Sequence, residues 1–350
     1  MSFSETEERS KPSTFLPNNL RQNPRSTPRG HKGELSDAAT FFTNGALCGL
    51  TAGATAANVP VIADPAIVAG AAAPVFSFES GQRYWYSTGE ASKDLYDASG
   101  TRLLSRLTYD HLDAHSGEVF FNATHNPTGI FVKGLLGAGG VTEGSLVDED
   151  FPPLTEPYSN TSSDQRGGDI TYFTTDLGYY FWNTPRYRIG ALVGHNFWNE
   201  RYDAVGCAQQ AANSQICADM PTNVGIISQD NDWHSLRLGL AGQTQLTDRL
   251  SLSGDVAFLF TRLDGKDRHH LRPEINPVPE DGDGHGLQLE AVLNYKVTDF
   301  FNIGVGARYW RVASDGSAHF EDTPSNGSPQ VDDWKAERYG MFVQASIKFD

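Results

Sequence analysis

The sequence has little of three features that would each indicate a class of protein. Within its 350 residues, no apolar run approaches the ~18 residues of a membrane-spanning helix. The net charge of −16 leaves no basic excess for nucleic acid, which we exclude as a partner. Cysteine and methionine occur only 3 times each. The chain is instead generous in glycine (35 residues) and aromatic residues (11%), a composition that suits an all-β protein and, most fully, a membrane β-barrel.

The first 75 residues differ in composition from the rest. Residues 1–34 are rich in Ser, Pro, Asn, Arg and Glu and poor in aliphatic side chains, which indicates disorder. Residues 38–73 are small and apolar and follow several arginines, as in an export signal peptide with a long basic region. Cleavage is expected after Ala57 or Ala73, and a flexible Ala/Gly linker is the alternative. We therefore divide the chain into a leader, 1–75, and a barrel domain, 76–350.

Ten segments of the barrel domain alternate between apolar and polar side chains, which is the two-residue period of a β-strand. In one of them Leu236, Leu238 and Leu240 fall on one face, whereas Ser235 and Arg237 fall on the other. The segments are 76–90, 102–124, 129–139, 168–182, 187–203, 233–247, 250–263, 285–297, 300–313 and 335–350. Their even number suits a closed antiparallel barrel, and each reaches the ~9–11 residues that cross a bilayer as a tilted strand.

The connections between these segments differ in length by parity. The even-numbered connections are tight turns, such as His-Asn-Pro-Thr at 125–128, whereas the odd-numbered ones are long, such as 140–167 and 264–284. Short periplasmic turns opposite long extracellular loops are typical of outer-membrane barrels. We predict a ten-stranded antiparallel transmembrane β-barrel in the bacterial outer membrane, with its apolar face toward lipid. The charged face, which includes Asp176, Arg237 and Arg308, would fill a narrow lumen, so an open pore is not expected.

Two of the three cysteines lie in one predicted external loop. Cys207 and Cys217 would form a disulfide on an exported protein, stabilising it by about 2–3 kcal/mol through loop closure. A reactive or metal-binding pair is the alternative. Cys48 belongs to the leader.

Two short acidic motifs fall in predicted external loops on the same rim of the barrel. Asp148 and Asp150 stand in the second loop, and Asp267 and His269 in the fourth. Three carboxylates and an imidazole that meet there can activate a water molecule, with the imidazole as base and one carboxylate orienting it. Crowded carboxylates also raise at least one pKa, which favours acid–base chemistry. Each motif alone is a weak signal: acidic loops are often merely solvated or hold Ca²⁺, and His270 is a rival base.

These residues, on a ten-stranded barrel, resemble the omptin family of outer-membrane endopeptidases. The segment Val147–Phe151 (V-D-E-D-F) resembles the family's V-D-x-D-W, and Asp267–His269 (D-R-H) resembles its Asp-x-His; similarity also covers Ser105–Asp110 and Gly167–Leu177. The resemblance implies cleavage of peptides or proteins at the cell surface by an activated water. Asp148, Asp150, Asp267 and His269 would be the catalytic residues. It implies no cofactor, contact with outer-membrane lipid, a dependence on lipopolysaccharide and, we expect, a monomer.

The sequence also departs from the family. Omptins use acidic residues to bind basic substrates, whereas Gly265 stands where some members carry an acid, and Lys266 and Arg268 add positive charge. Glu79, on the first strand, is the remaining candidate for a substrate-binding acid. Two other functions therefore remain as alternatives: a non-proteolytic barrel that acts as an adhesin or surface binding protein, and a porin.

Overall fold

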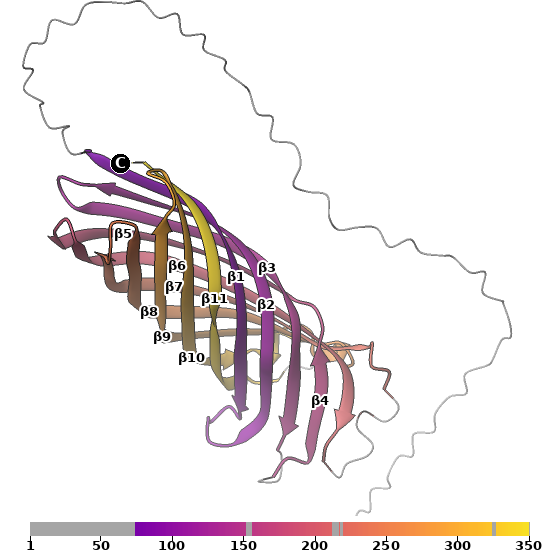
Figure 1. The fold of residues 1–350 in the computed structure, drawn as a ribbon. Helices are drawn as coiled ribbons and strands as arrows, with labels where there is room; N and C mark the ends of the chain where they lie inside the picture. Colours follow the sequence, from indigo (N-terminus) through magenta and orange to yellow (C-terminus); the bar gives the residue numbers. More distant parts are fainter. Residues whose placement is uncertain (1–73, 152–155, 212–216, 218–219, 324–326, 350) are drawn as a thin grey trace, which may run out of the picture. The chain divides into compact units, whose positions relative to one another are not determined.

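The computed structural model describes residues 74–151, 156–211, 217, 220–323 and 327–349 (Figure 1). The predicted leader, with its cleavage sites and Cys48, lies outside the described residues apart from Pro74 and Val75. No helix within the described ranges is long and apolar enough to cross a membrane.

Eleven antiparallel β-strands make up nearly all of the described chain. They are β1 (Phe76–Tyr96), β2 (Leu103–His125), β3 (Ile130–Asp150), β4 (Ser159–Gln165), β5 (Asp169–Asn183), β6 (Tyr187–Gln209), β7 (Gly225–Gln245), β8 (Leu250–His269), β9 (Val278–Lys296), β10 (Phe301–Ala318) and β11 (Gln330–Phe349). Two short 3₁₀ helices, η1 (Pro273–Ile275) and η2 (Phe320–Asp322), lie in the connections after β8 and β10.

Ten of these strands form a closed ring. Each pairs with its neighbours in chain order, except that β3 pairs with β5, and the ring closes where β1 pairs with β11 from Phe78↔Phe349 to Leu95↔Asp332. β4 is the additional strand, and it pairs with β3 and β6 beyond the start of β5. The predicted ten-stranded antiparallel barrel is therefore confirmed, with an eleventh strand in what was expected to be a loop.

The strands extend further at one end than the sequence predicted. The turns between β2 and β3, β5 and β6, β7 and β8, and β9 and β10 are as short as expected. At the opposite end, however, β3 continues to Asp150 and β8 to His269, through residues assigned to loops. These extensions lack an apolar outer face because they rise beyond the lipid, so apolar alternation did not reveal them. Asp148, Asp150, Asp267 and His269 consequently lie on strands rather than in loops.

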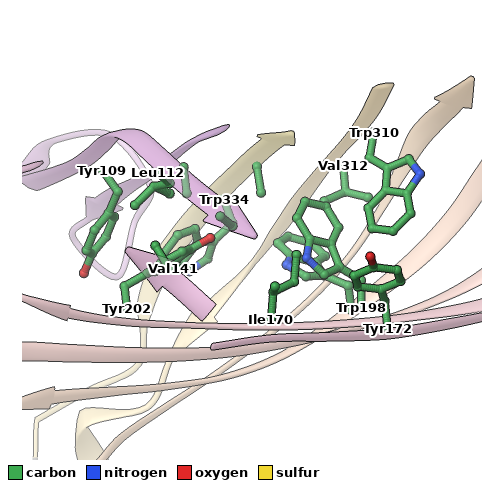
Figure 2. Close-up of a cluster of buried hydrophobic side chains, with 14 of the residues drawn as sticks. Tyr109, Leu112, Val141, Ile170, Tyr172, Trp198, Tyr202, Trp310, Val312 and Trp334 are labelled. Atoms are coloured by element: carbon green, nitrogen blue, oxygen red, sulfur yellow. The ribbon is translucent and has the colours of Figure 1, made fainter. Parts of the chain in front are cut away.

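The two faces of the wall have the predicted character. Leu236, Leu238 and Leu240 project outward from β7 and are 48%, 44% and 50% exposed, as a lipid-facing surface requires. The inward face carries an aromatic cluster (Figure 2). There Trp310 lies against Trp85, Tyr172 and Trp198, with ring centroids 5.0, 4.9 and 5.5 Å away.

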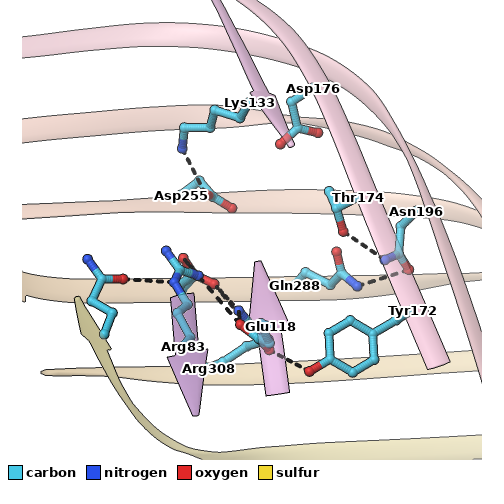
Figure 3. Close-up of polar contacts among 12 residues, drawn as sticks. Arg83, Glu118, Lys133, Tyr172, Thr174, Asp176, Asn196, Asp255, Gln288 and Arg308 are labelled. Atoms are coloured by element: carbon cyan, nitrogen blue, oxygen red, sulfur yellow. Dashed lines mark hydrogen bonds and ion pairs between the residues drawn. The ribbon is translucent and has the colours of Figure 1, made fainter. Parts of the chain in front are cut away.

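A layer of ion pairs lies next to this aromatic cluster in the lumen (Figure 3). Arg308 contacts Glu118 at 2.5 Å and Glu290 at 2.7 Å, and its guanidinium also lies 4.7 Å from the Trp85 ring centroid. Arg237 contacts Asp176 at 2.9 Å and Asp255 at 3.1 Å. A cavity of about 810 Å³ lies in the lumen toward the turn end, lined by residues of the short turns and by Arg308, Glu290, Arg237, Asp176 and Asp255.

We expect Arg308→Ala to destabilise the barrel strongly. Glu118 and Glu290 would be left with Arg83 alone, which lies 4.0 Å from Glu118 and 2.9 Å from Glu290. Breaking a buried ion pair costs about 3–5 kcal/mol. The unfolding midpoint in denaturant measures this loss of stability, and the gel mobility of the folded barrel reports the folded fraction at each denaturant concentration. Lys296→Ala is the control, because Lys296 pairs with Asp299 at the exposed turn end, and its unfolding midpoint should stay near that of the unmodified protein. Equal midpoints for both variants would contradict a structural role for the layer.

Candidate active site

The candidate site lies at the barrel mouth, at the end opposite the short turns. Asp148 and Asp150 come from the last residues of β3, and Asp267 and His269 from the last residues of β8. Side chains two positions apart on a strand share a face, so each pair projects together. On β8 the inward face carries Asp267 and His269, since Lys266 and Arg268, which alternate with them, are exposed on the outer wall. On β3 Asp148 and Asp150 share the face of Leu146, which is buried.

Asp267 and His269 form a hydrogen-bonded pair. His269 Nε2 lies 3.1 Å from Asp267 Oδ2, and the carboxyl group is almost fully buried. Asn276 holds the histidine backbone on both sides, accepting from His269 N and donating to its carbonyl oxygen, each at 2.7 Å. An imidazole that donates from Nε2 to the carboxylate keeps Nδ1 as its proton acceptor. This is the geometry of a general base with an orienting carboxylate.

Asp148 and Asp150 lie on the facing wall. Ser105, on β2, donates to Asp148 Oδ1 at 3.4 Å, and the Asp150 carbonyl oxygen accepts from Tyr158 N at 2.9 Å. β3 is paired on both edges here, with β2 and with β4, so the backbone under the two carboxyl groups is fixed. The structure therefore brings these two acids to the same mouth as Asp267 and His269.

The electrostatics of the mouth separate its acids into two kinds. Burial, reinforced by Asp150, raises the pKa of Asp148 to about 7, and burial also raises the pKa of Asp150. Burial acts in the same direction on Asp267, but His269 and Lys93 outweigh it and hold the pKa of that carboxyl well below its usual range. Asp267 likewise outweighs burial at His269 and raises the pKa of the imidazole. Asp148 adds to this rise, so its charge and the imidazole act on each other across the mouth.

A second set of charged residues, which the sequence did not predict, lies under the Asp267–His269 pair, called the dyad below. Lys93 Nζ lies 2.5 Å from Asp267 Oδ2 and 2.7 Å from Glu280 Oε1. Glu280 in turn accepts from Gln229 Nε2 at 2.8 Å and from Trp334 Nε1 at 3.2 Å. Lys93 fell in the connection 91–101, which was expected to be a loop. The small and polar residues between Ser87 and Lys93 gave no apolar alternation that would have extended the strand.

Two residues proposed from the sequence do not join the site. His270, the rival base, turns away from Asp267, and its Nε2 lies 2.8 Å from Ser228 Oγ. The predicted placement of Glu79 in a substrate pocket is wrong, because Glu79 pairs with Lys348 and Asn122 at the turn end of β1 and accepts from Ser346 Oγ at 2.7 Å. About 14 residues of strand separate it from Lys93, or roughly 45 Å at 3.3 Å per residue.

The predicted disulfide is confirmed. Cys207, near the end of β6, is bonded to Cys217, and their Cα atoms are 5.3 Å apart. In the described part of the chain, His319, Glu321 and Asp322 form a group with closely spaced metal-ligating atoms. The His319 ring already lies between two carboxylates, with Nδ1 2.7 Å from Glu321 Oε1 and Nε2 2.5 Å from Asp281 Oδ1. Both ring nitrogens of His319 therefore already have carboxylate partners, which also raise the pKa of its imidazole.

The site thus combines an anchored base, a buried carboxylate that supports its positive charge, and two further carboxyl groups on the facing wall. Such a set can take a proton from a water molecule and hold that water by hydrogen bonds while it attacks.

Comparison with known proteins places the fold and the family. The solved structure of the outer membrane protease OmpT from Escherichia coli matches with a TM-score of 0.65 at 15% identity, covering 78% of this chain and 97% of that chain. The attachment invasion locus protein Ail of Yersinia pestis gives a TM-score of only 0.27 at 11% identity, over 77% of this chain and 98% of that one. No curated protein sequence matches. The model of the Omptin family matches residues 86–348, about three-quarters of the chain. The chain therefore belongs to the omptin family, a protease-type family of outer-membrane β-barrels, and is itself an outer-membrane β-barrel.

Proposed function

We propose that this protein is an omptin-type endopeptidase that hydrolyses peptide bonds at the cell surface. The observation that carries the proposal is the Asp267–His269 pair: a buried carboxylate hydrogen-bonded at 3.1 Å to an inward-facing imidazole whose backbone is fixed by Asn276. Asp148 supports it, because its charge acts on the same imidazole from the opposite wall.

In the proposed reaction a water molecule attacks the scissile carbonyl carbon. His269 Nδ1 takes the proton of the water as its oxygen bonds to that carbon, and Asp267 supports the imidazolium that results. Asp148 and Asp150 position the water by hydrogen bonds. The tetrahedral intermediate collapses when the C–N bond breaks, and the imidazolium returns its proton to the leaving amine. No covalent enzyme intermediate forms, and neither a cofactor nor a metal takes part.

The substrate in this proposal is a peptide or an exposed protein segment that reaches the mouth from outside the cell. Its cleavage site need not be basic. Gly265 supplies no acid, and a side chain there would begin 3.1 Å from Glu280 Oε2 and 3.0 Å from Asn231 Oδ1. Lys266 and Arg268 project from the outer wall and so do not place their charge inside the mouth. We also propose that the barrel is a monomer and that lipopolysaccharide on its outer wall supports activity.

Removing either member of the Asp267–His269 pair should sharply reduce turnover. We expect Asp267→Ala and His269→Ala each to lower kcat by roughly 10²–10⁴-fold, the usual contribution of a positioned general base. The assay is cleavage of a fluorogenic peptide library by refolded protein, run with and without lipopolysaccharide.

The matched controls for these variants are Asp264→Ala and His270→Ala, which remove the same two side chains a few residues away. Asp264 is exposed on the outer wall and His270 bonds to Ser228, so both controls should retain the activity of the unmodified protein. No cleavage by folded protein in either lipid condition would overturn the proposal and favour the alternative of a surface binding protein.

Activity should depend on pH with an acid limb near or above neutrality. Below about pH 7 Asp148 gains a proton, and His269, whose pKa is raised, is increasingly charged and unable to accept one. Both changes act in the same direction, so kcat/KM should rise as pH is raised through about 7. A profile of kcat/KM from about pH 5 to about pH 9 measures this. In Asp148→Asn the remaining acid limb should be that of His269 alone, and a profile that is flat or falls over this range would contradict the assignment.

A further inference from the structure

Lys93 is a buried cation that spans the mouth. It starts from β1, where it pairs with Trp334 of β11 and Leu107 of β2, yet its ammonium group reaches Asp267 on β8 and Glu280 on β9. Only 2% of the residue is exposed. The Asp267 oxygen that it contacts, Oδ2, is the oxygen that also faces His269 Nε2. A single carboxylate oxygen is therefore shared by a permanent cation and by the candidate base.

We propose that Lys93 is a positioning residue of this site, which fixes the Asp267 carboxylate and reduces the basicity of the His269 imidazole behind it. The inference deepens the proposed function and rests on it. In it, the ammonium group holds Oδ2 in place and leaves Asp267 less of its charge to offer His269, so that the imidazole releases its proton more readily.

Anchoring contacts on its far side show how Lys93 is kept in this position. Glu280 Oε1 accepts from Nζ, while Glu280 Oε2 is held by Gln229 and Trp334. The Trp334 ring also lies 5.6 Å from Nζ. The Lys93 ammonium group is therefore held between two fixed carboxylates, Glu280 on one side and Asp267 on the other. A buried lysine costs free energy unless its charge is paired, and two carboxylates at 2.5 and 2.7 Å satisfy that requirement.

Other charged and titratable groups also face the dyad. They are Tyr109 on β2, Asp148 and Asp150 on β3, Glu280 on β9, Asp332 on β11, and Arg272 after β8, which acts on Asp150. All but Arg272 and Tyr109 are acids. Lys93 is therefore the main positive charge that opposes the acids below the imidazole.

Lys93 could instead have a purely structural role, which would be to neutralise Glu280. The two roles predict different pH profiles for a double variant. Lys93→Met leaves Glu280 buried without its cation. Lys93→Met/Glu280→Gln removes both charges together, so Glu280 is no longer a buried charge without its cation, and Asp267 keeps only His269 as a charged partner. If Lys93 served Glu280 alone, the double variant would regain the pH profile of the unmodified protein. If Lys93 acts on Asp267 and His269, the profile stays displaced.

The experiment measures the pH profile of kcat/KM and, in parallel, the titration of the His269 ring by NMR of the ¹⁵N-histidine-labelled barrel, assigned with His269→Asn. We expect the acid limb and the ring titration to move to higher pH by about one unit in Lys93→Met and in the double variant. Below the midpoint this lowers kcat/KM about tenfold at a given pH. Lys93→Arg, which keeps the charge, should stay near the unmodified protein, as should Lys335→Met, which removes an exposed lysine from β11.

Unchanged midpoints in the folded double variant would overturn the inference. If the unmodified protein shows no turnover, the proposed peptidase function fails, but the NMR titration still tests Lys93: a displaced ring titration supports its action on His269, and an undisplaced one overturns it. If Lys93→Met alone does not fold, the double variant decides by the same two measurements.

Discussion

The structure depends on closing one ring of backbone hydrogen bonds. In lipid every peptide N–H and C=O needs a partner within the protein, and a sheet can provide this only by pairing its first strand with its last. Here that closure is the pairing of β1 with β11 over 18 residues, and it leaves β1 no freedom to shift by one position. A shift of one residue would exchange inward and outward side chains along the whole strand. Trp85 and Lys93 would then face outward, so the aromatic cluster in the lumen would lose Trp85 and the mouth would lose its buried lysine.

The balance of charge differs between the ion-pair layer within the membrane and the mouth of the barrel. In the membrane, carboxylates are matched by guanidinium groups, as Arg83 and Arg308 are with Glu118 and Glu290. At the mouth, acids outnumber bases, since Asp148, Asp150, Asp267, Glu280 and Asp332 face Lys93 and His269. Burial, reinforced by Asp150, raises the pKa of Asp148 to about 7, so this acid takes up a proton near neutrality, whereas His269 and Lys93 keep Asp267 charged.

The sequence predicted the part of the barrel that contacts lipid better than the part that rises above it. The ten barrel strands and their short turns were correct because lipid enforces a strict apolar period on one face, as in Leu236, Leu238 and Leu240. β4, with the sequence Ser-Asn-Thr-Ser-Ser-Asp-Gln, was missed because above the membrane neither face needs to be apolar. The four candidate catalytic residues were found through motif resemblance. Lys93 was not, because its role depends on a partner 174 positions away that only the closed register brings near. Glu79 is the converse case: its strand was predicted correctly, but Glu79 lies at the turn end of that strand, far from the mouth.

The short strand β4 has a mechanical consequence for the site. β5 begins only at Asp169, so without β4 the upper part of β3 would be an edge strand there, with one row of backbone groups open to solvent. β4 fills that place and carries the sheet on to β6, between Asp164↔Val205 and Thr161↔Gln209. The stretch that holds Asp148 and Asp150 is therefore an interior strand even outside the membrane. Both edges of this stretch are hydrogen-bonded, so the two acids stand on backbone that can open only when the sheet itself opens.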